Sequence, residues 1–458
     1  MSPESLRRHW PWIVLGLLAC YFLAWPIWRA QFLLEIWPTE GWNAYLQDAA
    51  AEGRPLYPPL DALTANNYPP LSFYAVGALG KIFGDNLFVG RAVSIAGLLC
   101  VAIEIFYAVR ILTGSPTGGL FGAAWYVAIM ARNSTTYIAT NDPQLAGEAI
   151  MGAALVWFLA RDKAGMSRCG PLLLMVVGGF WKHNLVAIPI TAVAWLILTT
   201  GRRAARPILL SGFACLAGLG LCVASFGNDF IGNMLANRQY AFANVLTNIG
   251  HLQWSALALV IWAGWALYNP DLRAARFTAL HIASGLLACI LQWFGHGVSG
   301  NAEFDLILAL GIGIGVTFAD VEMSWLGRRI GAAGTRDLMT IVLVLRLVIA
   351  ERQETALLII SPDFRATVWQ AQRIAQQDIT VVLAIDGDVA CSNKVVCRAA
   401  GKRFVVDEFK MEELVMTGKA TDADISALIK SRGITNFTNN PKAGDSWNTS
   451  LSQALRSP

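Results

Sequence analysis

The sequence predicts a polytopic α-helical membrane protein with about eleven spans and a small α/β domain at its C-terminal end. Hydrophobic residues make up 55% and charged residues 14% of the 458-residue chain, whereas soluble domains contain about 25% charged residues. Apolar runs near the roughly 20 residues that a helix needs to cross a bilayer recur through the first three quarters of the chain. After residue 352 the composition becomes mixed.

The apolar runs define a first domain over residues 1–352. The predicted spans cover residues 12–34, 87–112, 118–133, 143–160, 169–181, 184–200, 207–226, 252–268, 277–294, 303–319 and 337–350. The first lacks a small-residue cleavage site, so we interpret it as an uncleaved span. The run 169–200 is divided because "FWKHN" lies in its middle, where a Lys costs on the order of 3 kcal/mol. The division places Lys182 and His183 at a membrane surface.

The loop charges predict the orientation. With the N-terminus inside, the inner loops contain most of the cations (Arg7, Arg8, Arg161, Lys163, Arg168, Arg202, Arg203, Arg206, Arg273, Arg276, Arg328, Arg329 and Arg336), and the outer segments contain scattered ones (Arg54, Lys81, Arg132, Lys182 and Arg238). This is the positive-inside pattern. An odd number of spans places the C-terminal part outside. If the span 337–350, which contains Arg346, does not cross, that part is cytoplasmic.

Residues 353–458 predict the small α/β domain. "TALLIIS", "DITVVLAID" and "KRFVVDEF" are typical of strands, and "RATVWQAQRIAQQ" and "NKVVCRAAG" of helices. The absence of a phosphate loop or catalytic triad favours a docking or structural domain. Cys391 and Cys397 predict a disulfide if this part is outside, and two buried thiols are the alternative.

The longest predicted outer loop, residues 35–86, contains two helical patterns. In the first, one face at helical spacing is formed by Trp42, Tyr45, Leu46 and Ala49. We expect this helix to lie along the interface with its aromatic side chains in the lipid boundary. Glu40 lies in its first turn. A second interfacial pattern follows "NNYPP" and ends with Lys81.

Further polar residues fall on the same predicted face. They are Arg132, Asn141, Asp142, Lys182, His183, His296 and Asn301. The simpler interpretations are a helix cap for Asp142, which precedes Pro143, and hydrogen-bonded interfacial residues for the histidines. A carboxylate can also deprotonate a hydroxyl acceptor, and cations can stabilise a leaving phosphate. Together with an apolar groove, these groups suit transfer from a lipid-linked phosphate.

The order of these motifs resembles the membrane glycosyltransferases of the GT-C fold. The similar segments are "TEGWNAYLQDAAAEGRPLY", "YPPLSFYAVGALGKIFGDNLFVGRAVSIAGL", "TNDPQLAGEAIMGAALVWFLA", "GGFWKHNLVAIPI", "GVSGNAEFDLILALG" and the tail from "VVCRAAGKRF". They are similar to the protein mannosyltransferase and aminoarabinose transferase superfamily, including its bacterial branch of lipopolysaccharide-core galacturonosyltransferases. The resemblance covers most of the chain.

The resemblance implies inverting transfer of a sugar from a polyprenyl phosphate to a hydroxyl of a glycan, lipid or protein. Glu40 matches the second acidic position and is implied as the base, assisted by Asp142, whereas Thr39 replaces the first. Lys81, Lys182, His183 and Arg132 are implied to contact the donor phosphate. Substrate contacts are expected from Tyr68, Asn141, His296 and Asn301. No metal or other cofactor is required, although a divalent metal is compatible, and no nucleic-acid partner is expected.

The implied location is a bacterial inner membrane, with a cytoplasmic N-terminus and a periplasmic tail. Two other functions remain open. A transporter or flippase of lipid-linked sugars would use the same groove without chemistry, although the halves show no convincing repeat. A catalytically inactive membrane scaffold is the second, because Thr39 departs from the acidic motif.

Overall fold

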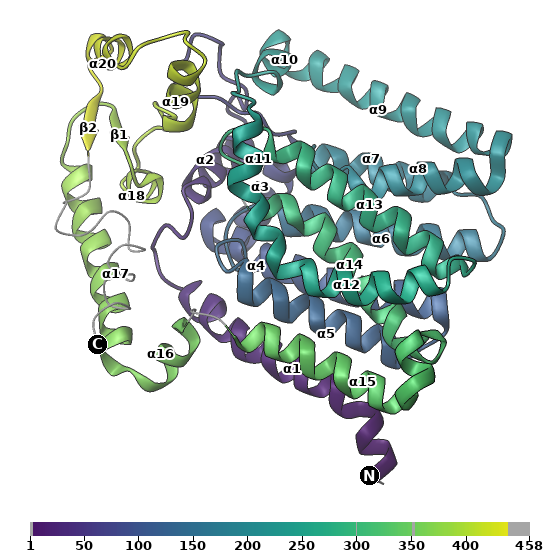
Figure 1. Ribbon diagram of the computed structural model, residues 1–458. Helices are drawn as coiled ribbons and strands as arrows, with labels where there is room; N and C mark the ends of the chain where they lie inside the picture. The colour runs from purple at the N-terminus through teal and green to yellow at the C-terminus, as the bar shows by residue number, and fades with distance from the viewer. Residues whose placement is uncertain (1–2, 299, 350–352, 438–458) are drawn as a thin grey trace.

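The computed structural model describes residues 3–298, 300–349 and 353–437, with side chains from residue 9 onward (Figure 1). The side chains of Arg7 and Arg8, residue 350 of the last predicted span and residues 438–458 of the predicted tail domain lie outside the described part. Long, roughly parallel helices form a bundle, and the helices of the tail lie at one end of it (Figure 1).

Every predicted span coincides with a helix. These helices are α1 (Pro3–Arg29), α4 (Asn86–Thr113), α5 (Pro116–Asn133), α6 (Gln144–Lys163), α7 (Cys169–Trp181), α8 (Ala187–Thr200), α9 (Ala205–Phe226), α12 (Gln253–Tyr268), α13 (Arg273–Trp293), α14 (Phe304–Ala319) and α15 (Trp325–Val348). Among the described residues, six segments are long and apolar enough to cross a membrane, one of which joins α8 and α9. The chain is therefore a multi-pass membrane protein, and the break at Lys182 and His183 is confirmed.

Helix α14 is the most deeply buried helix of the bundle. Every residue from Phe304 to Phe318 is buried. On its contact with α5, a Cβ at Gly122 would lie 2.4 Å from the carbonyl oxygen of Gly311, and one at Gly118 2.6 Å from that of Gly315. Small residues four apart let the two backbones approach closely, as is common between helices in membranes.

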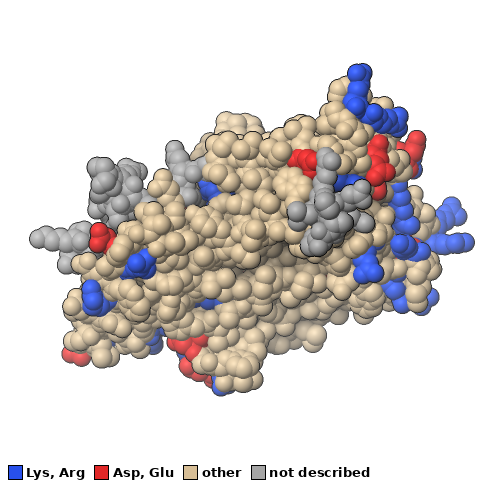
Figure 2. All heavy atoms as spheres, turned by 90° about the horizontal axis from the view of Figure 1, so that it is seen from below, with Lys and Arg blue, Asp and Glu red and all other residues tan. Residues whose placement is uncertain are grey.

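Surface charges lie mainly at the ends of the bundle. Figure 2 shows a broad uncharged band across the middle of one face, with Lys and Arg side chains gathered at the right-hand end. The exposed arginines of the predicted inner loops include Arg202, Arg203, Arg206, Arg276, Arg328 and Arg329. The tail lies at the opposite end, on the same side of the bundle as the loop 35–86 (Figure 1). The uncharged band is the surface expected to face lipid.

The first helical pattern of the loop is α2 (Thr39–Glu52), but its predicted contact with lipid is wrong. Trp42 and Tyr45 are buried against protein: the ring of Trp42 packs on Phe73, and that of Tyr45 stacks on Phe404 of the tail. The second pattern is α3 (Leu71–Phe83), which leaves Tyr74, Ile82 and Phe83 exposed. The exposed apolar side chains of α3 are consistent with the predicted position of this helix at the membrane interface.

The tail is more helical than the sequence predicts. Its elements are α16 (Glu354–Ile360), α17 (Pro362–Leu383), β1 (Val389–Cys391), α18 (Lys394–Ala399), α19 (Glu408–Met416), α20 (Asp422–Ser431) and β2 (Thr435–Phe437). The two predicted helices lie within α17 and around α18. The three predicted strands are wrong: the first two are helical, and the third is an extended segment leading into α19. The described sheet pairs β1 with β2 in parallel.

Apolar contacts explain the helical outcome for α17. Phe364 packs on Trp25 of α1, with ring centroids 5.1 Å apart, and Trp369 packs on Phe32 at 4.7 Å. A buried helical face can have the same short apolar run as a strand, so periodicity alone does not separate the two. Short helices α10 (Asn228–Met234) and α11 (Phe242–Asn248) complete the described outer segments.

The tail lies close to α2 at Gly41. A Cβ at this position would lie 2.5 Å from the Cβ of Lys394 and 2.8 Å from the backbone nitrogen of Val395. Alanine favours a helix over glycine by about 1 kcal/mol, yet here it would collide with the backbone of α18. We expect Gly41→Ala to lower the melting temperature and to increase proteolysis of the tail. A variant with the melting temperature and the proteolysis rate of the wild type would contradict this contact.

Candidate functional site

Two cavities meet near the end of the bundle that carries the tail. The polar cavity, about 540 Å³, is lined by the loop 37–68, residues 232–240 and the tail, including Trp37, Thr39, Trp42, Tyr68, His183, Arg238, Lys394, Asp407 and Glu413. The apolar groove, about 470 Å³, lies among α6, α7, α8 and α9 and is lined mainly by Met175, Phe180, Val193, Ile208 and Leu219. His183 and Met234 line both, so the two cavities lie next to each other.

A buried ion pair lies directly behind this junction. Lys182 Nζ donates to Asp142 Oδ1 at 2.9 Å, and both side chains are almost completely buried. The ammonium lies 4.9 Å from the ring centroid of Tyr68, which lines the polar cavity. Burial alone would lower the pKa of Lys182, but the charge of Asp142 and the contact with Tyr68 raise it above its ordinary value. Lys182 is therefore cationic, and the ring of Tyr68 lies between it and the polar cavity.

Local structure fixes both members of the pair. Asp142 Oδ1 also accepts from the backbone N–H of Gln144 at 2.8 Å, as expected for a carboxylate at a helix start. Trp181 Nε1 donates to the carbonyl of Pro143, which joins the end of α7 to the start of α6. Asp142 thus lies at the start of α6, one residue before the N-cap Pro143, and the same side chain anchors Lys182.

His183 is the predicted phosphate contact that reaches both cavities. Its ring lies 6.1 Å from that of Tyr68. Burial among the surrounding protein atoms lowers the pKa of His183 to about 4, and the charges of Lys182 and Arg238 act in the same direction. The side chain is therefore neutral at pH 7, and it can donate one hydrogen bond to a phosphate oxygen.

Glu40 lies in the protein interior and does not line either cavity. Its Oε1 accepts from Arg91 Nε at 2.6 Å, and its Oε2 accepts from Arg91 Nη2 at 2.8 Å. The backbone N–H groups of Ile36 and Asn141 donate to the same carboxylate. Both side chains have almost no exposed surface. The carboxylate therefore joins Ile36 and Asn141 to Arg91 in the protein interior.

The remaining predicted site residues lie outside the linings of the two cavities. Asn141 is buried and exchanges two hydrogen bonds with Gln47. His296 accepts or donates at Glu413 Oε1, 3.0 Å away. Asn301 accepts from Tyr137. Lys81 is exposed at the end of α3, and Arg132 is buried beside Trp254, and neither lines a described cavity.

Sequence reasoning missed two groups of site residues. Arg91 lies inside the predicted span 87–112, four residues from its start, where an arginine indicates a buried partner, so that signal was available. The cavity residues of the tail, Lys394 and Asp407 among them, gave no signal because their proximity depends on how the tail docks. In the described ranges, no three His, Cys, Asp or Glu side chains form a group able to hold a metal ion.

The fold is similar to that of solved membrane proteins. One is a crystal structure of ArnT from Cupriavidus metallidurans bound to undecaprenyl phosphate, with a TM-score of 0.60, 14% identity and coverage of 92% of this chain and 90% of that chain. The apo structure of the same protein gives a TM-score of 0.57 at the same identity and coverage. No family model matches the sequence, and neither does a curated protein. The chain therefore has the GT-C fold of these structures along most of its length.

Proposed function

We propose that the protein transfers a sugar from a polyprenyl-phosphate donor to a hydroxyl acceptor at the outer face of a bacterial inner membrane. The observation that carries this proposal is the junction of the polar cavity with the apolar groove at His183 and Met234. In this proposal part of the polyprenyl chain lies in the groove, with its phosphate at the junction and its sugar in the polar cavity. The undecaprenyl phosphate bound by ArnT supports the same ligand class for this fold.

The charges at the junction suit a leaving phosphate. The neutral ring of His183 donates from the cavity wall. Lys182 lies behind Tyr68, so we propose that the Tyr68 ring turns aside when a phosphate enters and that Lys182 then contacts it. Asp142 holds the ammonium in place. As the bond between the anomeric carbon and the phosphate oxygen breaks, these groups stabilise the charge that develops on that oxygen.

The geometry supports a different role for Glu40 from the base that the resemblance implies. A base must come within hydrogen-bond reach of the proton it takes, whereas Glu40 is enclosed by Arg91 and two backbone amides. We propose that Glu40 fixes the outer loop against α4. The tail and loop 35–86 lie on one side of the bundle, which supports a periplasmic tail if the donor is used at that face.

The test is transfer by the purified protein, in nanodiscs, from a panel of undecaprenyl-phosphate sugars to lipid-saccharide and peptide acceptors. Gly179 lines the groove, and a Cβ there would meet no atom within 4 Å. We expect Gly179→Leu to fill part of the groove and to raise the KM for the lipid donor about 10-fold. This corresponds to about 1.4 kcal/mol from lipid surface that is no longer buried. Gly220→Leu is the matched control, because Gly220 has equally open space on α9 away from the groove.

Two results would overturn the proposal. No transfer with any donor, together with translocation of the lipid-linked sugar across vesicles, would establish the flippase function instead. Transfer that Gly179→Leu and Gly220→Leu affect equally would show that the lipid does not occupy this groove.

A further inference from the structure

The C-terminal tail forms one wall of the polar cavity. Two of its charged side chains are used to hold it there. Lys410 Nζ donates to the carbonyls of Leu60 and Thr64 at 3.2 and 3.0 Å. Glu413 accepts from the backbone N–H of Gln239 at 2.6 Å and also contacts His296. These bonds dock the tail against outer segments on both sides of the cavity.

Asp407 and Lys394 are the remaining tail charges that line the cavity. Both side chains are largely buried, at 7% and 6% exposure. Asp407 Oδ1 accepts from the backbone N–H of Phe409 at 3.1 Å and so caps α19. Lys394 Nζ lies 3.5 Å from Glu408 Oε2, a long contact with a half-exposed partner. A carboxylate that can accept and an ammonium that can donate thus line the polar cavity of about 540 Å³.

The surroundings of Asp407 suit proton transfer. Burial raises the pKa of the Asp407 carboxyl above its ordinary value, while the charge of Lys394 and the backbone amides of the cap oppose the shift. A carboxylate with a raised pKa is the stronger base, provided that it remains ionised at the working pH. The aromatic rings of Trp37, Trp42 and Tyr68 line the same cavity and provide apolar surface for a sugar ring.

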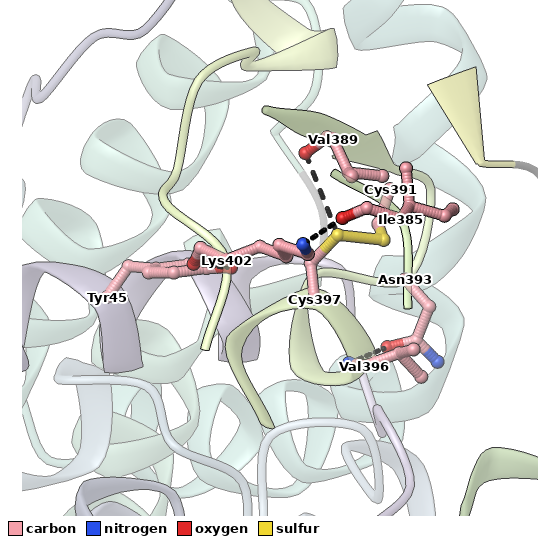
Figure 3. Close-up of a disulfide and its surroundings, with 8 residues drawn as sticks. All are labelled: Tyr45, Ile385, Val389, Cys391, Asn393, Val396, Cys397 and Lys402. Carbon is pink, nitrogen blue, oxygen red and sulfur yellow. Dashed lines mark hydrogen bonds between the residues drawn. A yellow bond between two sulfur atoms is a disulfide. The ribbon is translucent and has the colours of Figure 1, made fainter. Parts of the chain in front are cut away.

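Lys394 is held in place from three directions. The Cys391–Cys397 disulfide closes the turn that contains it, joining β1 to α18 (Figure 3). Within that turn, Asn393 Oδ1 accepts from the backbone N–H of Val396 and caps α18 (Figure 3). On its other side, Lys394 packs on Gly41 of α2. The backbone of Lys394 is therefore held in place at the cavity wall.

We propose that the tail supplies the acceptor side of this active site, with Asp407 as the base and Lys394 as a substrate-positioning residue held by the disulfide. This rests on the proposed sugar transfer. The acceptor oxygen attacks the anomeric carbon, its proton passes to Asp407, and the anomeric carbon–oxygen bond breaks with its electron pair on the leaving polyprenyl phosphate. Lys394 binds hydroxyl oxygens of the sugar, either of the donor or of the acceptor.

Asp407→Asn tests the base directly. Asparagine caps a helix as well as aspartate does, so the fold of α19 is retained while the basic oxygen is lost. We expect kcat to fall about 100-fold or more, with an unchanged melting temperature and unchanged affinity for undecaprenyl phosphate alone. A variant that folds and transfers at the wild-type kcat would remove Asp407 from the mechanism.

Lys394→Met tests the positioning role. We expect the KM for one substrate to rise about 10-fold, the loss of one hydrogen bond to a charged group, while kcat changes less. A raised donor KM identifies the donor sugar as the ligand, and a raised acceptor KM identifies the acceptor. Lys430→Met is the control, because Lys430 is exposed on α20. Equal KM values in both variants would contradict the assignment.

The disulfide has its own test. We expect the double variant Cys391→Ser, Cys397→Ser, and the wild type treated with a reductant, to show the same KM change as Lys394→Met. Reoxidation should restore the wild-type value. Reduced protein with unchanged KM would show that the disulfide does not position Lys394. Absence of transfer by the wild type refutes the proposed function, whereas transfer that is insensitive to Asp407 and Lys394 refutes only this inference.

Discussion

Replacing Lys182 by methionine is expected to lower the rate of sugar transfer about 100- to 1,000-fold, the usual loss when one charge-stabilising donor is removed. The ammonium is next to the junction of the two cavities and is oriented by Asp142 at 2.9 Å. Methionine retains much of the length and apolar volume of the side chain without its charge. The measurement is single-turnover transfer from an undecaprenyl-phosphate sugar, in protein shown by its melting curve to be folded.

The same variant leaves Asp142 buried without its cation. Breaking a buried ion pair costs about 3–5 kcal/mol of stability, so a loss of transfer by Lys182→Met alone has two explanations. The double variant Lys182→Met, Asp142→Asn separates them, because it removes both charges. We expect the double variant to recover stability but not transfer. Recovery of transfer as well would show that Lys182 has only a structural role.

Replacing Arg91 by methionine is expected to have the largest effect on stability, about 3–5 kcal/mol. It leaves the carboxylate of Glu40 buried without the guanidinium that pairs with it. It also removes the guanidinium donors to the carbonyls of Ala30, Phe32 and Leu34. The free energy of unfolding, or the melting temperature in nanodiscs, is the measurement.

Glu40→Gln is the companion variant, and it distinguishes the structural role of Glu40 from the predicted catalytic one. If Glu40 fixes the loop, Arg91→Met with Glu40→Gln is more stable than Arg91→Met alone, and Glu40→Gln transfers sugar at close to the wild-type kcat once folded. If Glu40 is the base, folded Glu40→Gln loses kcat by a factor of about 100 or more. That second result would reject the structural assignment.

The bundle was predictable because a bilayer imposes one simple rule on the sequence. Each apolar run long enough to approach a span became a helix, and "FWKHN" marked a true break because a lysine is costly at mid-bilayer. Lys182, His183 and Asp142 lie at the ends of such runs, and the structure brings Lys182 and Asp142 into contact. Few polar residues lie at the ends of apolar runs. Those on the same membrane face are therefore expected to lie near one another.

The tail was less predictable because its contacts are remote in sequence. "DITVVLAID" has the composition of a strand, yet it continues α17, whose earlier turns pack on α1. Trp42 and Tyr45 form an amphipathic pattern suited to lipid, but Phe404 of the tail covers Tyr45. The carboxylate of Glu40 was predicted to be free for catalysis because its partner, Arg91, lies inside the predicted span 87–112. For α2 and Glu40 the contacting partner is remote in the sequence, whereas the apolar run 378–386 was wrongly predicted to be a strand.

Binding of undecaprenyl phosphate to the purified protein in nanodiscs tests the central claim most directly. We predict that the wild type binds it more tightly than undecaprenol, because the phosphate contributes contacts at the junction. We predict weaker binding of undecaprenyl phosphate by both Lys182→Met and Gly179→Leu, and wild-type binding by Gly220→Leu. Equal affinity for undecaprenol and undecaprenyl phosphate, or affinity unaffected by Lys182→Met, would contradict the assignment of this junction as the phosphate site.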